Sequence, residues 1–364
     1  MTVLKSKAFL RGTIRTPHSR QTRQGFEAMD RNERTADFPP DVMEQIRNLI
    51  TPFLLRAYPE PEPFYEKLGR WLGFPREMLL LAPGADGVLR AIFETFVEPG
   101  EEVLHAVPSY AMVPVYCNLS GAVSRTLVFH EDLSLPLEQI LEAINPRTKL
   151  VVLANPNQPI ERLYTQAECR SLLARCREHQ ALLVLDEAYH PFCDETALPL
   201  VKEYENLIIV RSFSKAFGLA GLRLGYGVST RENVLELNKV RPMYEANSCA
   251  LAIAGYLLDN DHLMRSYVAQ AGESRRFLRE ALENRGVPAQ GRYGNSVLVT
   301  LPPDLSAPEV GKELRRKGFL VRAESTPPLS NHLRITVGPL EQAQRFLAAF
   351  ENIVAAQNAQ GIPR

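Results

Sequence analysis

Short apolar runs alternate with amphipathic stretches through the middle of this chain. Hydrophobic residues at helical spacing predict helices over residues 41–50, 61–72 and 85–97. Other short runs, rich in Val, Ile and Leu, have the length and composition of buried strands. Strands that alternate with helices form a mostly parallel sheet with helices on both faces, so the predicted fold class is α/β. The apolar runs are centred near Val103, Leu127, Val152, Val184, Ile209 and Leu224.

The end of the chain has a different pattern, in which one long helix precedes separated strands. The helix is predicted over residues 261–285, and the strands over 296–301, 319–322 and 333–337. These elements are expected to form a smaller α+β domain. The first residues carry scattered arginines and prolines, which is typical of an arm ordered only against other surfaces. Because 364 residues exceed one compact core, we expect an arm (1–40), a large domain (41–260) and a small C-terminal domain (261–364).

Composition and charge exclude several classes of protein. The chain is 45% hydrophobic and 23% charged, which is ordinary for a globular protein in water. Its 42 basic and 42 acidic residues cancel, so nothing favours a nucleic-acid or membrane partner. No apolar stretch approaches the ~20 residues of a membrane span, and charges stand where a signal peptide would have its apolar core. Five cysteines without a C-x-x-C pair indicate neither a metal site nor a disulfide framework, and a reducing cytoplasm is expected.

Lys215 is the first candidate for chemistry, because it closely follows the apolar run 207–210. Taken alone, a lysine after a strand is usually an exposed loop residue. A lysine amine that loses its proton through burial, however, can form a Schiff base with an aldehyde. Ser212 and Ser214 just before it, and Arg223 eight positions after it, suit a phosphate. An aldehyde and a phosphate together describe pyridoxal 5'-phosphate.

Polar residues follow two further apolar runs. Asp186 ends the run 181–185, and Asn157 follows the run 149–154 in a turn made rigid by prolines. Taken alone, Asp186 would be a turn or helix-capping residue. In a pyridoxal phosphate site such a carboxylate keeps the pyridine nitrogen protonated, so that the ring can accept electrons. The phenol of Tyr189 could donate to the ring oxygen of the same cofactor, and Asn157 would present its amide to the ring.

At this point the chain resembles a known family, the fold type I pyridoxal phosphate-dependent aminotransferases. It is most similar to the histidinol-phosphate aminotransferase branch, from about residue 25 to the C-terminus. The resemblance implies an aspartate aminotransferase-like fold, with pyridoxal 5'-phosphate as cofactor and a homodimer as the active unit. It rests on seven segments in the family's order: Tyr58-Pro59-Glu60, Gly84-Ala85-Asp86-Gly87, Pro108-Ser109-Tyr110, Asn155-Pro156-Asn157, Asp186-Glu187-Ala188-Tyr189, 212–223 and 333–338.

The resemblance also implies roles for residues that are unremarkable by themselves. Gly84-Ala85-Asp86-Gly87 would be an ordinary glycine turn, and Tyr110 an ordinary core or surface tyrosine. In the family, the amides of Ala85 and Asp86 bind the phosphate at a helix N-terminus. Ser212, Ser214 and Arg223 complete that site, and Tyr110 stacks on the pyridine. Tyr58 belongs to the neighbouring subunit's site, so the homodimer is expected to share its active sites.

Arg334 is the candidate for binding the substrate. It lies within an apolar strand, where an unpaired cation would be costly, and a substrate carboxylate would satisfy it. The alternative partner is an internal Asp or Glu. Tyr58, Asn157 and Arg322 are the further residues expected on the substrate side. Small-molecule amino acids and 2-oxo acids are the expected partners.

The expected reaction moves an amino group between an L-amino acid, or an amino-alcohol phosphate, and a 2-oxo acid with ping-pong kinetics. Lys215 removes the α-proton as general base, Asp186 holds the pyridine charge, and Tyr110 is the third catalytic residue. Two alternatives remain open: a decarboxylase or lyase on the same scaffold, and a cofactor-binding regulator without catalysis. No added basic or DNA-binding segment favours the regulator.

Three departures from the family's pattern bear on the substrate. Gln158 and Ile160-Glu161 replace the family's residues after Asn157. The family's early Asn-Glu-Asn-Pro element is Asn32-Glu33-Arg34-Thr35 here, and its early Pro-Tyr is Pro17-His18. These departures favour a substrate other than histidinol phosphate, which remains the alternative. A group of basic residues could bind an anionic side chain, although a solvated arm is the simpler interpretation: Arg15, His18, Arg20, Arg23, Arg34 and Arg322.

Overall fold

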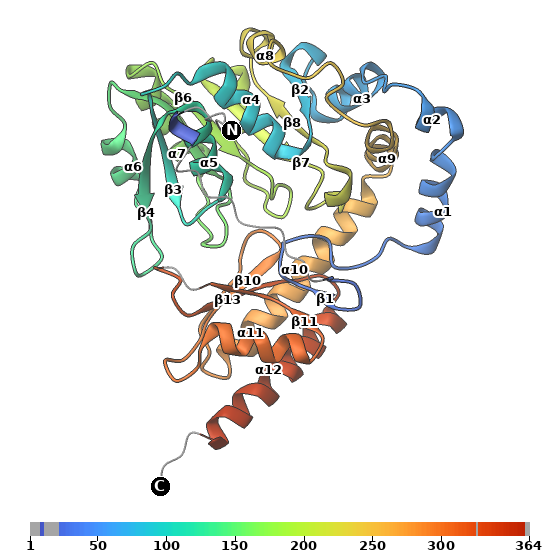
Figure 1. Ribbon diagram of the computed structural model, residues 1–364, viewed down its shortest axis with the longest axis vertical. Helices are drawn as coiled ribbons and strands as arrows, with labels where there is room; N and C mark the ends of the chain where they lie inside the picture. Colours follow the sequence, from blue (N-terminus) through green and yellow to red (C-terminus); the bar gives the residue numbers. More distant parts are fainter. Residues whose placement is uncertain (1–7, 11–21, 325–326, 361–364) are drawn as a thin grey trace, which may run out of the picture.

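A seven-stranded sheet forms the centre of the protein, whose computed structural model describes residues 8–10, 22–324 and 327–360 (Figure 1). Its strand order is β2-β8-β7-β6-β5-β3-β4. Strand β8 lies antiparallel between β2 and β7, and every other pair is parallel. The predicted α/β class with a mostly parallel sheet is therefore confirmed. The strands are β2 (Leu79–Ala82), β3 (Glu102–Val107), β4 (Val123–Val128), β5 (Thr148–Ala154), β6 (Leu182–Asp186), β7 (Leu207–Ser212) and β8 (Gly225–Val228).

Both faces of this sheet are buried under separate apolar layers. Along β6, Leu183 and Leu185 belong to one buried cluster, and Val184 between them belongs to another. The alternation follows from the pleat, because neighbouring side chains of a strand point to opposite faces. The helices of this part of the chain are α1 (Pro40–Leu49), α2 (Pro52–Arg56), α3 (Glu62–Leu72), α4 (Gly84–Phe96), α5 (Met112–Ser120), α6 (Leu137–Ala143), α7 (Gln166–Glu178), α8 (Arg231–Asn238) and α9 (Ser248–Asp259), with short 3-10 turns η1 (Ala8–Leu10), η2 (Arg76–Met78), η3 (Leu198–Lys202) and η4 (Ala220–Leu222).

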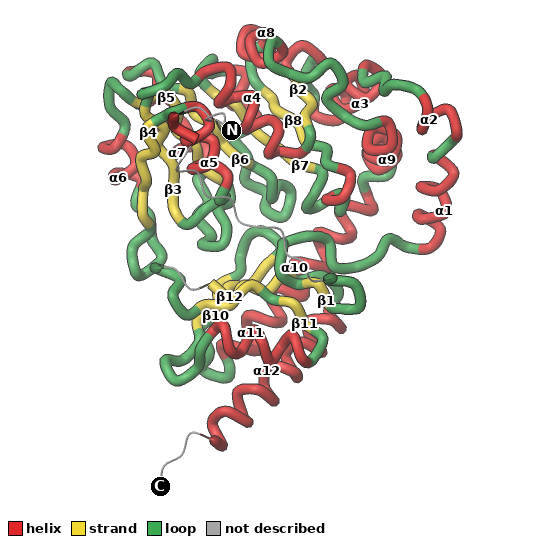
Figure 2. Tube along the Cα trace, in the orientation of Figure 1, coloured by secondary structure: helices red, strands yellow, loops and turns green. Residues whose placement is uncertain are grey.

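A second, four-stranded antiparallel sheet lies below the first and has the order β12-β13-β10-β9 (Figure 2). The long helix predicted over 261–285 is α10, and it runs from one sheet towards the other (Figure 1). The elements after α9 are α10 (His262–Glu283), β9 (Ala289–Gln290), β10 (Ser296–Thr300), α11 (Ala307–Arg316), β11 (Phe319–Leu320), β12 (Arg322–Glu324), β13 (His332–Thr336) and α12 (Leu340–Gln360).

The single strand predicted over residues 319–322 is wrong. Phe319–Leu320 pairs in parallel with β1 (Glu27–Ala28), whereas Arg322–Glu324 pairs with β13 in the four-stranded sheet. The predicted strand is therefore two short strands, each paired with a different neighbour. The pairing with β1 joins residues almost 300 positions apart, and no local pattern could indicate it.

The segment after β1 connects the N-terminal region to both sheets. Met29 is fully buried, donates its N–H to Leu320, and accepts from the N–H of Thr336. These contacts hold the segment against the C-terminal end of β13, and the segment then leads to α1 (Figure 1). In the described part of the chain, every helix is too short or too polar to cross a membrane.

Candidate active site

The predicted site residues gather where β5, β6 and β7 end. These strands are parallel and adjacent, so their carboxyl ends meet at one edge of the sheet. Asp186 is the last residue of β6 and lies opposite Ala154 of β5 and Val210 of β7. Asn157 and Lys215 each follow their strand by three residues. The topology thus brings together three residues that are far apart in the sequence.

Asp186 is a buried carboxylate that accepts one hydrogen bond from the described residues. Its side chain is only 9% exposed, and Oδ1 accepts the N–H of Ala188 at 3.0 Å. Burial raises the pKa of Asp186 to about 6, against the opposing effects of the Ala188 N–H and the charge of Lys215. A further cation at this carboxylate would lower that pKa and keep Asp186 ionised. A protonated pyridine nitrogen is such a cation.

Lys215 lies in a tight turn beside this carboxylate. Gly218 donates its N–H to the carbonyl of Lys215 at 3.1 Å, which closes the turn after β7. Lys215 Nζ donates to the carbonyl oxygen of Arg31 at 3.1 Å and lies 5.6 Å from the ring centre of Tyr189. The amine is therefore held between the sheet edge and the N-terminal segment.

The N-terminus of α4 provides donors for an anion. Helix α4 begins at Gly84, so the N–H groups of Ala85 and Asp86 belong to its first turn, and no side chain caps it. Arg223 Nη1 donates to Ser214 Oγ at 3.4 Å, and Ser214 in turn donates its N–H to Ser212 at 3.0 Å. Free amides, two hydroxyls and a guanidinium are the groups that bind phosphate.

Two glycines allow these groups to come close. A Cβ on Gly84, whose φ is +78°, would lie 2.6 Å from Arg223 Nη2. A Cβ on Gly225 of β8 would lie 2.3 Å from the nitrogen of Ala85. Sequence reasoning missed Gly225, although its position two residues after Arg223 was a usable signal. The donor set and its close approach fit the phosphate of pyridoxal 5'-phosphate.

Tyr110 is held by the side chain of Asp86. Tyr110 donates to Asp86 Oδ1 at 2.9 Å, and Tyr116 of α5 donates to the same oxygen at 2.7 Å. Burial and the neighbouring carboxylate raise the pKa of Tyr110, which keeps the phenol protonated. The ring of Tyr110 remains 43% exposed, so a planar ligand can pack against it. From the sequence, only the backbone amide of Asp86 had a role, whereas in the structure its side chain holds Tyr110 in position.

Asn157 and Tyr189 each have a polar group that can still form a hydrogen bond with a ligand. Asn157 Nδ2 donates to the carbonyls of Pro108 at 3.1 Å and Ile160 at 2.9 Å. Asn157 Oδ1 is buried and has no partner among the described residues. Tyr189 accepts a hydrogen bond from Asn32 Nδ2 at 2.8 Å, which leaves its own proton to be donated. Buried polar atoms rarely stay unpaired, so both groups suit a polar ligand.

Arg334 and Arg322 face each other on neighbouring strands. They are directly opposite in the antiparallel pairing of β12 with β13. Arg334 Nη2 donates to the carbonyl of Asp30 at 3.2 Å, and its buried Nε has no partner among the described residues. Glu324 lies 3.8 Å from Arg334 Nη1 and 3.6 Å from Arg322 Nε. An internal acid is therefore present, but two arginines share it.

Tyr58 lies apart from the other predicted residues. It follows α2, is 75% exposed, and stacks on Tyr244 with ring centres 4.3 Å apart. Both tyrosines line a hollow of about 480 Å³ that also reaches Arg223 and Pro83. Within one chain, Tyr58 approaches the phosphate end of the site rather than Lys215.

The N-terminal basic residues have internal partners where they are described. Arg23 pairs with Asp30 at 2.6 Å and Glu33 at 2.7 Å. Arg34 stacks on Phe38 and on Tyr267 of α10. These two cations therefore stabilise the fold. Arg15, His18 and Arg20 lie outside the described residues.

A buried ion pair behind the site was not predicted. Glu187, which is fully buried, accepts from Arg211 Nη2 at 2.8 Å and Nε at 3.1 Å, and from Thr196 and the Ala197 N–H, each at 2.7 Å. Glu187 follows Asp186, and Arg211 precedes Ser212. The pair thus braces the strands that carry the carboxylate and the phosphate-binding hydroxyl.

Comparison with known proteins agrees with this geometry. Residues 29–350 match the family model described as aminotransferase class I and II, and the chain belongs to this family. It is a pyridoxal phosphate-dependent aminotransferase, and its cofactor is pyridoxal 5'-phosphate.

Several similar proteins are histidinol-phosphate aminotransferases. The histidinol-phosphate aminotransferase of Caldanaerobacter subterraneus is 31% identical over 90% of this chain and 93% of its own. That of Methanosarcina barkeri is 36% identical over 79% of this chain and 77% of its own. Among solved structures, histidinol-phosphate aminotransferase from Sinorhizobium meliloti, in complex with pyridoxal-5'-phosphate, has a TM-score of 0.86 at 24% identity and covers 98% of this chain and 99% of its own. This last likeness confirms the aspartate aminotransferase-like fold.

Proposed function

We propose that this aminotransferase acts on an amino donor that carries an anionic group, and that Arg334 and Arg322 bind that anion. The cross-strand pairing of the two arginines is the observation that carries the proposal. Like charges directly opposite each other destabilise a sheet unless a counter-charge lies between them. Glu324 supplies one negative charge for two guanidinium groups, and Arg334 is only 18% exposed, so a second anion between the arginines would be favourable.

The N-terminal segment links this arginine pair to Lys215. The carbonyl of Asp30 accepts from Arg334, and the carbonyl of the next residue, Arg31, accepts from Lys215 Nζ. The two carbonyls belong to neighbouring residues, and one residue of extended chain spans roughly 3.5 Å. Arg334 and Lys215 are therefore linked through this one residue step and one hydrogen bond at each end. This spacing supports a small substrate that reaches from Lys215 to the two arginines.

The remaining site residues receive the following proposed roles. When bound, pyridoxal phosphate supplies a reactive aldehyde and an electron-accepting ring. Lys215 takes the α-proton of the donor, and Asp186 stays ionised against the ring nitrogen. Tyr110 packs against the ring. Asn157 and Tyr189 hydrogen-bond to the ring, and the phosphate is held by the amides of Ala85 and Asp86 together with Ser212, Ser214 and Arg223.

A half-reaction screen tests the anionic-donor proposal. Single amino donors are mixed with the enzyme, and loss of the bound cofactor's visible absorbance is followed. The panel contains primary amines without an anionic group, amino acids, and histidinol phosphate, the compound in the names of the relatives described above. Donors with a carboxylate or phosphate should react at least tenfold faster than uncharged amines of similar size. Equal rates across the panel would contradict the proposal.

The arginines themselves supply the control for this screen. Arg334→Lys and Arg322→Lys keep the charge but lose the planar guanidinium group. Both variants should therefore lower the reaction rates of anionic donors and leave those of other donors unchanged. Arg70→Lys on the exposed face of α3 should change nothing. Product analysis in the same screen separates transamination from decarboxylation, because a decarboxylase releases carbon dioxide and does not accumulate the aminated cofactor.

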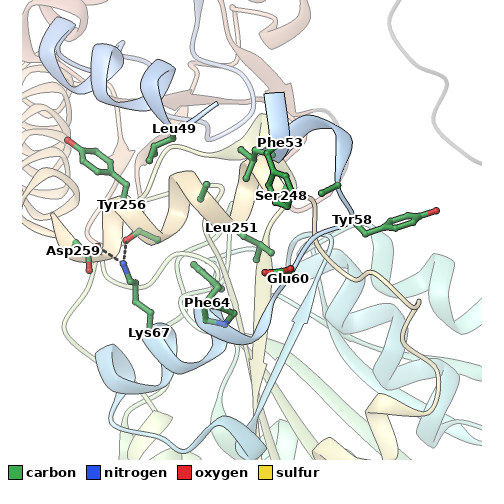
Figure 3. Close-up of a pocket in the computed structure, with 15 residues that line it drawn as sticks. Leu49, Phe53, Tyr58, Glu60, Phe64, Lys67, Ser248, Leu251, Tyr256 and Asp259 are labelled. Atoms are coloured by element: carbon green, nitrogen blue, oxygen red, sulfur yellow. Dashed lines mark hydrogen bonds and ion pairs between the residues drawn. The ribbon is translucent and has the colours of Figure 1, made fainter. Parts of the chain in front are cut away.

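We also propose that the active unit is a homodimer. Large apolar side chains are exposed on α2, next to its two ends, and in the loop before α9, including Tyr58 at 75% and Met243 at 80%. Next to them lies an apolar hollow of about 430 Å³ between α2, α3 and α9, with the ion pair of Lys67 and Asp259 at one end (Figure 3). Exposed apolar surface of this kind supports a protein–protein interface. The other exposed members are Ile50, Phe53, Leu55 and Tyr244.

Subunit exchange tests whether the sites are shared. Tyr58 projects away from its own core, so it can reach the partner's site across a two-fold interface (Figure 3). Tyr58→Phe and Lys215→Ala should each be weak or inactive. Heterodimers of the two contain one site with both original groups, and their activity should return towards half of the unaltered value. Tagged heterodimers that form without regaining activity would show that Tyr58 acts in its own chain.

Two further proposals concern organisation and location. Residues 1–40, 41–260 and 261–364 are proposed as an arm, a large domain and a small domain, supported by the separation of the seven-stranded sheet from the four-stranded sheet. Limited proteolysis should then cut first near these boundaries. A reducing cytoplasm is supported by the five cysteines, which are all free thiols. Thiol titration of the denatured protein from cells should return all five.

A further inference from the structure

Asn32 is a buried side chain that connects the candidate cofactor site to the four-stranded sheet. It is 1% exposed and lies on the N-terminal segment between Arg31 and Glu33. Its amide contacts Tyr189 on one side and Thr336, at the end of β13, on the other. Its backbone carbonyl accepts from Asn295 Nδ2 at 3.1 Å. These polar contacts fix a residue that belongs to none of the helices or strands.

The directions of these hydrogen bonds follow from their chemistry. The backbone N–H of Asn32 can only donate, and it donates to Thr336 Oγ1 at 2.9 Å. Thr336 is fully buried, and its hydroxyl proton finds its acceptor in Asn32 Oδ1 at 3.2 Å. The amide oxygen therefore faces Thr336, and the amide nitrogen faces Tyr189 at 2.8 Å. A flipped amide would leave the Thr336 proton without an acceptor among the described residues.

This orientation determines what the Tyr189 hydroxyl can do. An amide NH₂ group donates and cannot accept, so the Tyr189 oxygen must accept from Asn32. The phenolic proton then points elsewhere. The ring of Tyr189 packs beside Lys215, whose Nζ is 5.6 Å from the ring centre. The proton is thus available on the side where the cofactor binds.

We propose that Asn32 is a positioning residue that forces the Tyr189 hydroxyl to donate to the ring oxygen of the cofactor. The inference rests on the proposed function, in which Tyr189 contacts that oxygen. A donated proton stabilises the negative charge on the oxygen. Asn32 thereby sets the charge state of the cofactor through Tyr189, without touching the cofactor itself.

The backbone of Asn32 explains why asparagine suits this position. Its φ is +54°, in the left-handed region that Asn, Asp and Gly tolerate better than other residues. Asp and Gly can therefore replace it with little added strain, and each changes the hydrogen bond differently. Asp keeps the shape but offers only acceptors, so the Tyr189 proton turns to Asp. Gly removes the side chain and leaves the hydroxyl free to rotate.

The test is a pH titration of the bound cofactor's visible absorbance. Tyr189→Phe should raise the midpoint pH by about one to two units, because it removes a hydrogen bond to a charged oxygen. Asn32→Asp should raise the midpoint by a similar amount, although Tyr189 is intact. Asn32→Gly should raise it by less than half as much. In the Tyr189→Phe background, Asn32→Asp should add little, because both act on the same proton.

Each outcome of this titration decides between explanations. No shift with Tyr189→Phe would overturn the role of Tyr189 and the inference together. A shift with Tyr189→Phe but none with Asn32→Asp, or shifts that simply add, would overturn the inference alone. If Asn32→Asp does not fold, a second variant is available. Thr336→Val removes the hydroxyl that holds the side-chain amide oxygen of Asn32. An unchanged midpoint in that folded variant would likewise contradict the inference.

Discussion

The two sides of the candidate site are built in different ways. The cofactor edge lies where strands of one sheet end and where helix α4 begins. Its residues are Ala85, Asn157, Asp186, Ser212 and Lys215. The substrate wall comes from the segment 30–32 and from Arg322 and Arg334, which belong to regions about 300 residues apart.

The difference concerns what holds each side in place. Parallel strands with apolar faces position the cofactor edge, and the buried pair of Glu187 and Arg211 braces it from behind. Hydrogen bonds between distant segments position the substrate wall, such as those of Asn32 with Thr336 and Asn295. A core of packed strands resists displacement more strongly than a few polar contacts. Changes at the cofactor edge should therefore abolish chemistry, and changes at the wall should alter substrate binding.

The largest effect is expected from Lys215→Ala. The variant should lose turnover completely, because the amine that reacts with the aldehyde and moves the α-proton is gone. Folding should be preserved, since Lys215 lies in a turn at the sheet edge. Borohydride reduction followed by mass spectrometry measures the covalent adduct, and Lys239→Ala on the surface is the control. A normal adduct in Lys215→Ala would refute the assignment.

Asp186→Asn should lower the rate of α-proton removal by two orders of magnitude or more. The variant cannot hold a charge against the ring nitrogen, so the cofactor accepts electrons poorly. Single-turnover kinetics measure this rate. A rate close to that of the unaltered enzyme would mean that Asp186 is only a structural cap.

The cofactor-free protein should show the burial of Asp186 as a pH dependence of stability. Its pKa is about 6 when folded, against 3.8 for the ordinary group, so the folded state binds the proton more tightly. The contribution of Asp186 to the free energy of unfolding is then full below pH 4 and lost between about pH 4 and 6. The loss is at most about 3 kcal/mol. Urea unfolding across this range should show it in the unaltered protein and not in Asp186→Asn.

Glu187→Ala should destabilise the protein by about 3–5 kcal/mol, because it leaves the Arg211 guanidinium buried and unpaired. The matched control is Glu178→Ala, which breaks the exposed pair with Arg175 and should cost about 1 kcal/mol or less. Chemical denaturation measures both. Equal losses in the two variants would show that the buried pair does not brace the cofactor edge.

Arg334→Lys should lower kcat/KM for the preferred donor about 10- to 100-fold, which corresponds to the loss of one charge-assisted hydrogen bond. The cofactor's absorbance and its affinity should stay unchanged, because Arg334 belongs to the substrate wall. Steady-state kinetics and cofactor titration measure the two quantities. A changed cofactor spectrum would contradict the separation of the two sides.

The smallest effect is expected from Glu161→Gln, at a residue that joins the loop after β5 to the loop between β9 and β10. Glu161 follows β5 and accepts the N–H groups of Arg292 at 2.5 Å and Tyr293 at 3.0 Å. Gln keeps an acceptor but loses the charge, so the cost should be about 1 kcal/mol. KM should rise a few-fold while the rate of α-proton removal stays the same. A loss of that rate would mean that the contact also positions the cofactor edge.

The sequence by itself predicted most of the proposed cofactor edge, because a local pattern marks each strand end, whereas Ala85 was assigned only through the family resemblance. An apolar run that ends in Asp186 or is closely followed by Lys215 identifies both the strand and the polar group at its end. Adjacent parallel strands must end at the same edge, so these groups were bound to meet. The long helix α10 and the helices of the first half follow from hydrophobic spacing in the same way.

The sequence offered Arg334 and Arg322 as candidates, but only the tertiary structure decided how the proposed substrate wall is assembled. The division of β11 from β12 depends on β1, and the pairing of Arg322 with Arg334 depends on strand register. The role of Asn32 depends on hydrogen bonds to residues about 160 and 300 positions away. Such contacts form because folding satisfies buried polar groups with whatever partners the packed chain brings close, and the local sequence does not specify those partners.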